Sequence, residues 1–334
     1  MNLPIGYPYQ PMEAETADEL PQSGGWLFEP KWDGFRSLVF RDGDEVRIQS
    51  KASKPLERYF PDVVEAVRAL SPKRFVLDGE IVIPVDGRLS FDELLLRVHP
   101  AESRVKTLAA AHPARLVAFD LLADERGHAL VDLSLEERRP RLEAFGKRYF
   151  GRGAPIQVSA ATRSRATAEK WLAGGGEGDL DGVMAKRLDL PYRSGERDGM
   201  LKVKRKRTAD CVVGGFRYAS RGKQVGSLLL GLYDEDGLLH HVGFCSSLPA
   251  KVRLGLTEHL EASIEPPGFT GRAPGGPSRW STERSAAWKP LRPERVVEVE
   301  YDHVSGGRFR HGTRFLRWRP DKPPQQCTLS QIQR

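Results

Sequence analysis

The feature that most constrains the fold is a pattern of short β-rich runs that occurs twice along the chain. In the first block the runs cover residues 37–41, 46–49, 75–85 and 116–122. Asp-Gly pairs follow the first and third runs, as expected for hairpins. Helices are expected at residues 62–70 and, after a Ser134-x-x-Glu137 capping box, up to about residue 145. Because strands and helices mix without βαβ alternation, the pattern predicts an α+β fold of antiparallel sheets with flanking helices.

A basic stretch separates this block from the second one. Residues 202–207 read KVKRKR, and β-rich runs follow at residues 211–217, 227–233, 238–244, 296–301 and 315–318. One helix is expected, at residues 250–262. Several strands with one helix are typical of a small β-barrel such as an OB-fold. The chain of 334 residues is long enough for two domains. We therefore predict domains at residues 1–206 and 207–334, the second an OB-fold.

Composition narrows the class of protein. Lys and Arg number 52 against 45 Asp and Glu, a net charge of +7 that favours a polyanionic partner. The three cysteines, Cys211, Cys245 and Cys327, form no CxxC pair, which argues against a disulfide framework or a zinc ribbon and favours a reducing cytosol. The sequence contains no run of eighteen apolar residues and begins without a signal-peptide pattern, so we predict an intracellular protein without a membrane partner.

The candidate nucleophile is a lysine between acidic and basic residues, in the segment EPKWDGFR at residues 29–36. A lysine attacks only after its amine loses a proton, which burial or a neighbouring cation promotes. Arg36 could supply that cation. The alternative is an exposed lysine beside an Asp-Gly turn, and this short motif alone does not decide between the two.

The segment KWDGFR at residues 31–36 resembles the KxDGxR signature of the covalent nucleotidyltransferases, which include DNA ligases, RNA ligases and mRNA capping enzymes. Five further motifs of that superfamily follow in order: FVLDGE (75–80), VAFDLL (117–122), DGVMAK (181–186), MLKVK (200–204) and FLRWRPDK (315–322). Around residues 181–195 and 317–324 the chain is most similar to the small bacterial repair ligases of the ligase C type. The resemblance implies an adenylation domain followed by an OB-fold, in an ATP-dependent DNA ligase that seals 3′-hydroxyl/5′-phosphate nicks in DNA repair.

The resemblance also implies residue roles. Lys31 would attack the α-phosphate of ATP and carry AMP as a phosphoramide before passing it to DNA. Phe119 would stack on adenine, and Asp181 and Glu80 would hold Mg²⁺ or Mn²⁺. Without the motifs, Phe119 reads as a core residue and Glu80 as a solvent-facing one. The implied nucleotide-binding residues are Glu29, Arg36, Glu80, Phe119, Lys186, Lys202, Lys204, Arg317, Arg319 and Lys322. The expected DNA-binding residues are Lys51, Arg205, Lys206 and Arg207.

Two positions depart from the usual pattern of these ligases. Lys51 stands where an arginine is usual, which weakens bidentate binding of a nick phosphate, and Asp181 replaces the usual glutamate. The expected partners are double-stranded DNA with nicks or broken ends and a repair polymerase or end-binding protein. A monomer in the bacterial cytosol, associated with the nucleoid, is expected. The alternatives are an mRNA capping guanylyltransferase using GTP, an RNA ligase, and a nucleic-acid-binding module without catalysis.

Overall fold

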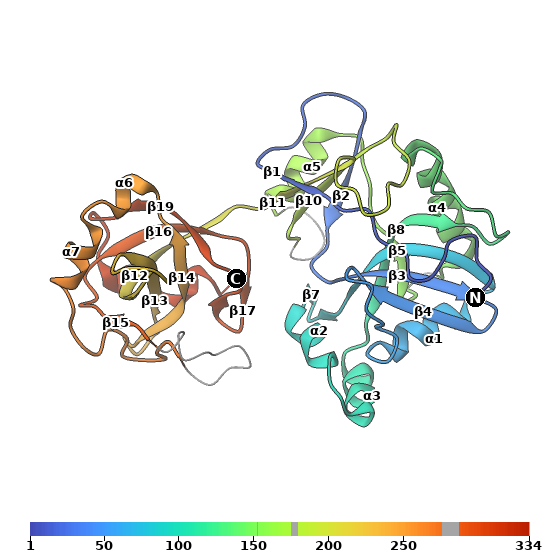
Figure 1. Ribbon diagram of the computed structural model, residues 1–334. Coiled ribbons are helices and arrows are strands. Elements are labelled where there is room, and N and C mark those ends of the chain that lie inside the picture. The colour runs from blue at the N-terminus through green and yellow to red at the C-terminus, as the bar shows by residue number, and fades with distance from the viewer. Residues whose placement is uncertain (152, 175–179, 276–286, 334) are drawn as a thin grey trace. The chain divides into compact units, whose positions relative to one another are not determined.

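The chain divides into two units, Met1–Arg205 and Lys206–Arg334, in a computed structural model that describes residues 1–151, 153–174, 180–275 and 287–333 (Figure 1). The larger sheet of the first unit has the strand order β4 (Glu45–Ser50), β3 (Phe35–Asp42), β5 (Arg74–Val82), β8 (Arg115–Ala123) and β9 (Ile156–Val158). Neighbours are antiparallel except β8 and β9. The run predicted at residues 75–85 is divided, because β6 (Pro84–Val85) leaves the sheet to form a separate hairpin with β7 (Arg88–Leu89).

Helices cover this sheet and bury apolar side chains against it. The two predicted helices are α1 (Pro61–Ala69) and α4 (Leu135–Tyr149). At the start of α4 the Ser134 backbone N–H donates a 3.0 Å hydrogen bond to Glu137, as the capping box predicts. Three further helices were not predicted: α2 (Phe91–Arg97), α3 (Glu102–Ala111) and α5 (Arg165–Leu172). The first two are short, and α3 carries little apolar periodicity, so the local sequence signal for both is weak.

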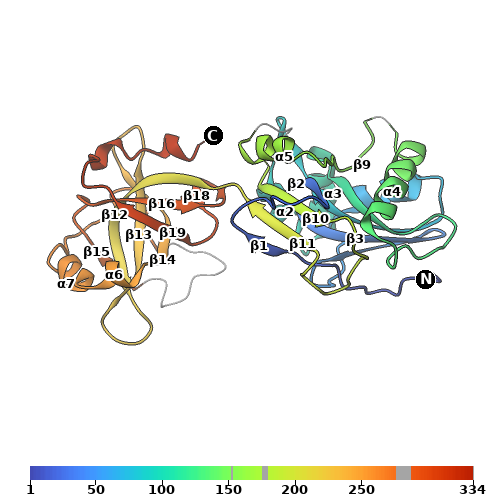
Figure 2. The same ribbon diagram turned by 90° about the horizontal axis from the view of Figure 1, so that it is seen from above.

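A second sheet in this unit has the order β1 (Glu15–Ala17), β11 (Met200–Lys204), β10 (Gly182–Arg187) and β2 (Trp26–Lys31). Figure 2 shows β1, β11 and β10 side by side. Lys31 is the last residue of β2. The sequence placed this lysine just before the first strong strand, so the strand that ends on it is a new finding.

The second unit is a β-barrel. Its strands are β12 (Arg207–Tyr218), β13 (Val225–Tyr233), β14 (Leu239–Ser247), β15 (Lys289–Pro290), β16 (Val296–Tyr301) and β19 (Thr313–Trp318). The sheet closes because β13 pairs with both β14 and β12. A small hairpin joins β17 (Val304–Ser305) to β18 (Arg308–Phe309), and the one-turn helices η1 (Pro324–Gln326) and η2 (Leu329–Gln331) follow β19. The barrel agrees with the predicted OB-fold.

The helix expected at residues 250–262 is two short helices, α6 (Ala250–Arg253) and α7 (Leu256–Glu261). The break falls at Gly255, whose φ of 68° lies in the left-handed region that ends a right-handed helix. The prediction of one continuous helix was therefore wrong. Among the described residues, no helix has the length and apolar character needed to cross a membrane.

Candidate active site

A cavity of about 230 Å³ lies in the first unit, beside the end of β2. Residues of β3, β5 and β8 from the larger sheet and of β2, β10 and β11 from the smaller one contribute to its wall. The lining residues are Glu13, Ala14, Pro30, Lys31, Trp32, Arg36, Lys51, Glu80, Phe119, Met184, Lys186, Met200 and Lys202. The structure thus brings together side chains from five of the six motifs. Glu29, Asp181 and Lys204 do not line the cavity.

Strand alternation explains which motif residues reach the cavity. Met184 and Lys186 are two residues apart on β10 and therefore share a face, as do Met200 and Lys202 on β11. The two strands pair so that Met184 lies opposite Lys202. Lys204 belongs to the same face of β11 by alternation, although it does not line the cavity.

Lys31 presents its amine next to a carboxylate. Its Nζ donates a hydrogen bond to Asp181, and the Asp181 backbone N–H donates to the Lys31 carbonyl at 3.1 Å. Burial lowers the pKa of Lys31, but the carboxylates of Asp181, Glu80 and Asp33 outweigh it, so the pKa is raised above the ordinary value. The amine is therefore an ammonium at neutral pH in this structure, and it must lose a proton before it can attack.

Arg36 is not the group that sets this pKa, contrary to the expectation from the sequence. Its guanidinium donates to both oxygens of Asp78, at 2.9 and 2.6 Å. The hydroxyl of Tyr192 donates to the same carboxylate at 2.7 Å. Burial lowers the pKa of Arg36, but Asp78 outweighs it. The paired Arg36 is a fixed, charged part of the cavity wall.

Phe119 offers an aromatic face to the cavity. It is half-buried, whereas its neighbours Ala118 and Asp120 on β8 are buried. The Nζ of Lys186 lies 4.4 Å, and the Cζ of Arg36 5.1 Å, from the centre of the Phe119 ring. These distances are in the cation–π range. The side chain is therefore not a simple core residue, because its ring lines the cavity near two cations.

Glu29 lies behind the cavity wall and is only 1% exposed. Its carboxylate contacts Lys186 Nζ at 2.7 Å and Arg139 Nη1 at 3.1 Å. Because Lys186 is also buried, its contact with Glu29 compensates the charge of the ammonium and fixes the orientation of the lysine side chain. Glu29 thus acts on the cavity through Lys186.

Glu80 is held largely in its neutral form. Burial raises its pKa to about 8, although the nearby charges of Lys31 and Arg36 oppose the shift. Glu80 lies opposite Arg36 in the register of β3 and β5. A cation that binds this carboxylate at neutral pH must therefore displace a proton.

Positive charge gathers around Lys202, which lines the cavity. Burial lowers the pKa of Lys202, and the charges of Lys51, Lys204 and Lys31 lower it further. Lys51, predicted to bind DNA, lines the cavity and forms a 3.0 Å ion pair with Glu13. Crowded cations of this kind are stabilised by a polyphosphate.

The predicted metal ligands, Asp181 and Glu80, both lie near Lys31. Over the described part of the chain, no cluster of three or more His, Cys, Asp or Glu side chains is arranged to hold a metal. Two carboxylates nevertheless suit Mg²⁺, which is often held by one or two carboxylates together with substrate phosphates. The residues fit a metal that arrives with a nucleotide.

The remaining predicted residues lie on or next to the second unit. Arg317 belongs to β19, and Arg319 and Lys322 follow it. Arg317 is 63% exposed and contacts Glu298 at 2.7 Å, whereas Arg319 and Lys322 are half-buried. Of the basic stretch, Arg205 and Lys206 lie between β11 and β12, and Arg207 begins β12; Lys206 is exposed.

Sequence reasoning missed several residues of this site. Trp32 lines the cavity, and its indole Nε1 donates to Ser159 Oγ at 3.0 Å. Met184 and Met200 would follow from strand alternation with Lys186 and Lys202, but strands were not predicted at these positions. Glu13 comes from a segment without a recognisable motif, so no local signal identifies it.

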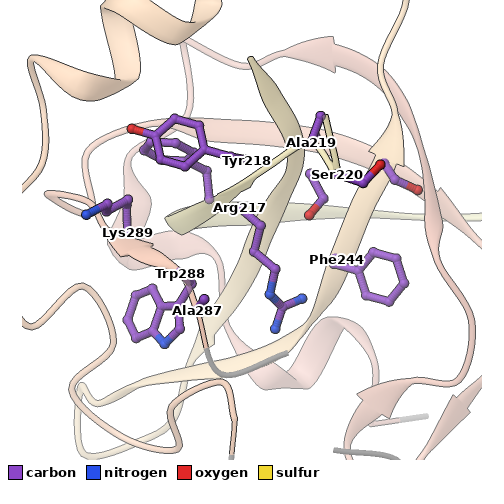
Figure 3. A pocket seen from close by; sticks show the side chains of 12 residues that line it. Arg217, Tyr218, Ala219, Ser220, Phe244, Ala287, Trp288 and Lys289 are labelled. Carbon is purple, nitrogen blue, oxygen red and sulfur yellow. The ribbon is translucent and has the colours of Figure 1, made fainter. Parts of the chain in front are cut away.

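A larger cavity, of about 830 Å³, lies on the barrel. Figure 3 shows the side chains of Arg217, Phe244 and Trp288 around it. None of the predicted site residues lines this cavity. Size therefore does not identify the site; the lysine and its surrounding cations do.

Comparison with protein families assigns most of the chain. The family described as "ATP dependent DNA ligase domain" matches residues 11–204, and "ATP dependent DNA ligase C terminal region" matches residues 221–322. The chain is 45% identical to "DNA ligase C1" of Mycolicibacterium smegmatis, over 99% of this chain and 96% of the relative. It is 42% identical to "DNA ligase C" of Mycobacterium tuberculosis, over 100% and 96% respectively.

Solved structures support the fold. A structure from a study of Lig E DNA ligases has a TM-score of 0.55 and 16% identity, covering 93% of this chain and 99% of its own. Another, described as "Pmar-Lig_Pre.", has a TM-score of 0.60 and 18% identity, and the match covers 93% of this chain and 67% of that chain. The arrangement of a two-sheet domain followed by a barrel is thus shared with these chains.

Proposed function

Since this chain belongs to the ATP-dependent DNA ligases, of the ligase C type, we propose that Lys31 is the residue that carries AMP. A ligase of this family uses ATP to join a 3′-hydroxyl to a 5′-phosphate at a nick. The observation that supports Lys31 most directly is its position at the cavity wall, with Nζ hydrogen-bonded to Asp181. A lysine amine is a suitable nucleophile once it is neutral.

Asp181 controls when that amine becomes neutral. While the carboxylate contacts Nζ it keeps Lys31 protonated; when it moves away, the largest influence that opposes burial is lost, so the pKa of Lys31 falls. The amine, having lost its ammonium proton to solvent, forms a bond to the α-phosphorus of ATP and releases a second proton to solvent, and pyrophosphate leaves with the electrons of the broken P–O bond. AMP then passes to the 5′-phosphate of the nick, and the 3′-hydroxyl displaces it.

The nucleotide contacts follow from the cavity. Phe119 packs against adenine. Lys186 and Arg36 lie near the Phe119 ring on the same wall of the cavity, and they help to hold the nucleotide there. Lys202 contacts the α-phosphate, with Lys204 adding charge nearby. Glu29 acts by holding Lys186.

Asp181 and Glu80 are the ligands we propose for Mg²⁺, or Mn²⁺ in its place. When bound, the metal neutralises charge on the phosphates. The raised pKa of Glu80 makes its participation dependent on loss of a proton, so Asp181 is the principal ligand of the two.

The barrel supplies further cations. We assign Arg317, Arg319 and Lys322 to the β- and γ-phosphates of ATP during adenylylation. Residues 1–206 are the proposed adenylation domain and residues 207–334 the OB-fold domain. Lys51, Arg205, Lys206 and Arg207 are the proposed contacts to the DNA backbone.

The biological setting is proposed by analogy with the ligase C relatives. The protein seals nicks or broken ends during excision repair or end joining in the bacterial cytosol, in association with the nucleoid. It works as a monomer, with a repair polymerase or an end-binding protein delivering the DNA.

Covalent labelling tests the proposal. The protein is incubated with labelled ATP or GTP, and we expect label from ATP on the wild type and none on Lys31→Ala. The matched control is Lys106→Ala, which removes a 67% exposed lysine on α3 and should label normally. Undiminished labelling of Lys31→Ala would contradict the assignment, and labelling by GTP alone would favour a guanylyltransferase. A nick-sealing assay with DNA or RNA at the 3′-hydroxyl strand then separates DNA from RNA ligation.

A further inference from the structure

Two of the cations assigned to the leaving pyrophosphate share one carboxylate on the barrel, that of Asp210. Arg319 Nη1 donates to both oxygens of Asp210, at 2.9 and 3.1 Å. Lys322 Nζ lies 3.5 Å from Asp210 Oδ2. The side chains of Arg319, Lys322 and Asp210 are 17%, 26% and 13% exposed. A single, largely buried carboxylate therefore sets the spacing of two cations.

A second carboxylate holds the opposite edge of the same guanidinium. Arg319 Nε donates to Asp321 Oδ1 at 3.0 Å, and Nη2 donates to Asp321 Oδ2 at 2.8 Å. This pairing lowers the pKa of Asp321 to about 2. The plane of the Arg319 guanidinium is thus fixed from two sides.

Asp210 itself is held rigidly. It lies within β12, and its backbone N–H donates to Gln331 Oε1 at 3.0 Å. Gln331 Nε2 in turn donates to the Asp210 carbonyl at 3.0 Å. Asp210 pairs in register with Glu298 on β16, and Glu298 contacts Arg317. A carboxylate on a paired strand is better fixed than one on a loop.

We propose that Asp210 is a positioning residue that holds Arg319 and Lys322 ready for the departure of pyrophosphate during lysine adenylylation. The proposal rests on the function assigned above to these two cations. Negative charge develops on the oxygen that leaves the α-phosphorus, and cations fixed in advance stabilise it without reorganising. Without Asp210, the two like charges would repel each other, and both long side chains would sample more rotamers.

The contacts with Asp210 leave donors free for phosphate. A lysine ammonium has three N–H donors, and Lys322 uses one of them toward Asp210. Arg319 has a second N–H on Nη2 besides the one directed at Asp321. Asp210 can therefore keep its contacts while both cations bind the nucleotide, which favours positioning over simple competition with ATP.

Asp210→Asn tests this, because it keeps the shape of the side chain and removes the charge. We expect the single-turnover rate of Lys31 adenylylation to fall by about 10- to 100-fold, in the range found for misplaced catalytic groups. Sealing of a pre-adenylylated nick should be unchanged. Asp210→Glu should recover part of the missing rate. The control is Glu265→Gln, which removes another carboxylate–arginine pair of the barrel, with Arg292 at 2.9 Å, and should affect neither step.

Two results would overturn the proposal. An unchanged or faster adenylylation rate in Asp210→Asn would mean that the carboxylate contributes nothing or competes with ATP. An equal reduction in both steps, with a lower unfolding temperature, would mean a structural role. Arg319→Ala and Lys322→Ala are measured beside it. If they leave adenylylation intact, the assigned function of the cations fails; if they impair it and Asp210→Asn does not, the positioning role alone fails.

Discussion

The protonation state of Lys31 depends on a balance between burial and three nearby carboxylates. Burial is the largest single influence and lowers the pKa of Lys31, yet the net direction is upward because Asp181, which contacts Nζ, acts together with Glu80 and Asp33. A sequence shows that a lysine has charged neighbours, but not which of them point at it. This is why Arg36 was expected to activate Lys31, whereas its charge is paired with Asp78.

The first prediction concerns Asp181→Asn and the pH dependence of labelling. The carboxylate stabilises the ammonium, so its removal lowers the pKa of Lys31 and increases the neutral fraction at a given pH. The midpoint of the rate of Lys31 adenylylation against pH should therefore move to lower pH, even if removal of a metal ligand reduces the maximum rate. Quenched single-turnover labelling across a pH series measures this midpoint. A midpoint that stays in place or rises would refute the role given to Asp181.

The second prediction concerns the buried charge of Lys186. Glu29→Gln leaves this amine, 5% exposed, without its carboxylate, and breaking a buried ion pair costs about 3–5 kcal/mol. Chemical denaturation should show that decrease in the free energy of unfolding. The control is Glu136→Gln, which breaks an exposed pair with Arg163 and should cost less than about 1 kcal/mol. Equal effects of the two variants would show that Glu29 does not compensate Lys186.

At the scale of elements, the close approach of the residue before β3 to β5 explains the glycine of the KWDGFR segment. A Cβ at Gly34 would lie 2.2 Å from the carbonyl oxygen of Ile81, a backbone atom of β5. The sequence suggested an ordinary Asp-Gly turn, but Gly34 does not have a positive φ. The glycine is required by packing between strands, which a local motif does not reveal.

The third prediction is that Gly34→Ala destabilises the first unit and reduces Lys31 labelling. The added methyl must push β3 away from β5, and such overpacking costs about 1–3 kcal/mol. Thermal unfolding and ATP labelling measure the two effects. Gly24→Ala is the control, because a Cβ there has no atom within 4 Å. If both variants unfold at the wild-type temperature, the close approach does not constrain the chain.

Element prediction succeeded where local patterns were strong. The runs at residues 37–41, 46–49 and 116–122 lie within β3, β4 and β8, and the capping box at Ser134 begins α4. Strands β2, β10 and β11 were missed, because their charged residues interrupt any simple apolar alternation. Those same charges form the site, so the strands that matter most for function were the hardest to find from periodicity.

At the scale of the whole molecule, the order of the motifs identified the family, whereas the contacts between side chains depend on how the sheets assemble. The sequence placed Lys31, Glu80 and Lys202 in separate motifs, and the two sheets bring them to one cavity. It did not indicate Asp210, which belongs to none of the motifs although it contacts both Arg319 and Lys322. Residues that act through a neighbour carry no signature of their own in a single sequence.

The fourth prediction concerns the basic stretch that joins the two units. If Lys206 and Arg207 bind DNA phosphates, replacing both with Gln should weaken binding of a nicked duplex. The slope of log K against log salt concentration should become shallower by about 0.9 for each phosphate that is no longer neutralised. The control is Lys147→Gln with Arg148→Gln, which removes the same charge from the exposed end of α4.

Three outcomes of the salt series have different meanings. A uniform effect of both pairs of substitutions would indicate only a change in net charge. Weaker binding with an unchanged slope would mean that Lys206 and Arg207 maintain the conformation of the stretch between the two units and do not bind phosphate. A shallower slope for the linker pair alone, with Lys31 labelling retained, would assign this stretch to DNA binding after adenylylation, because the charge then acts on the duplex and not on the nucleotide.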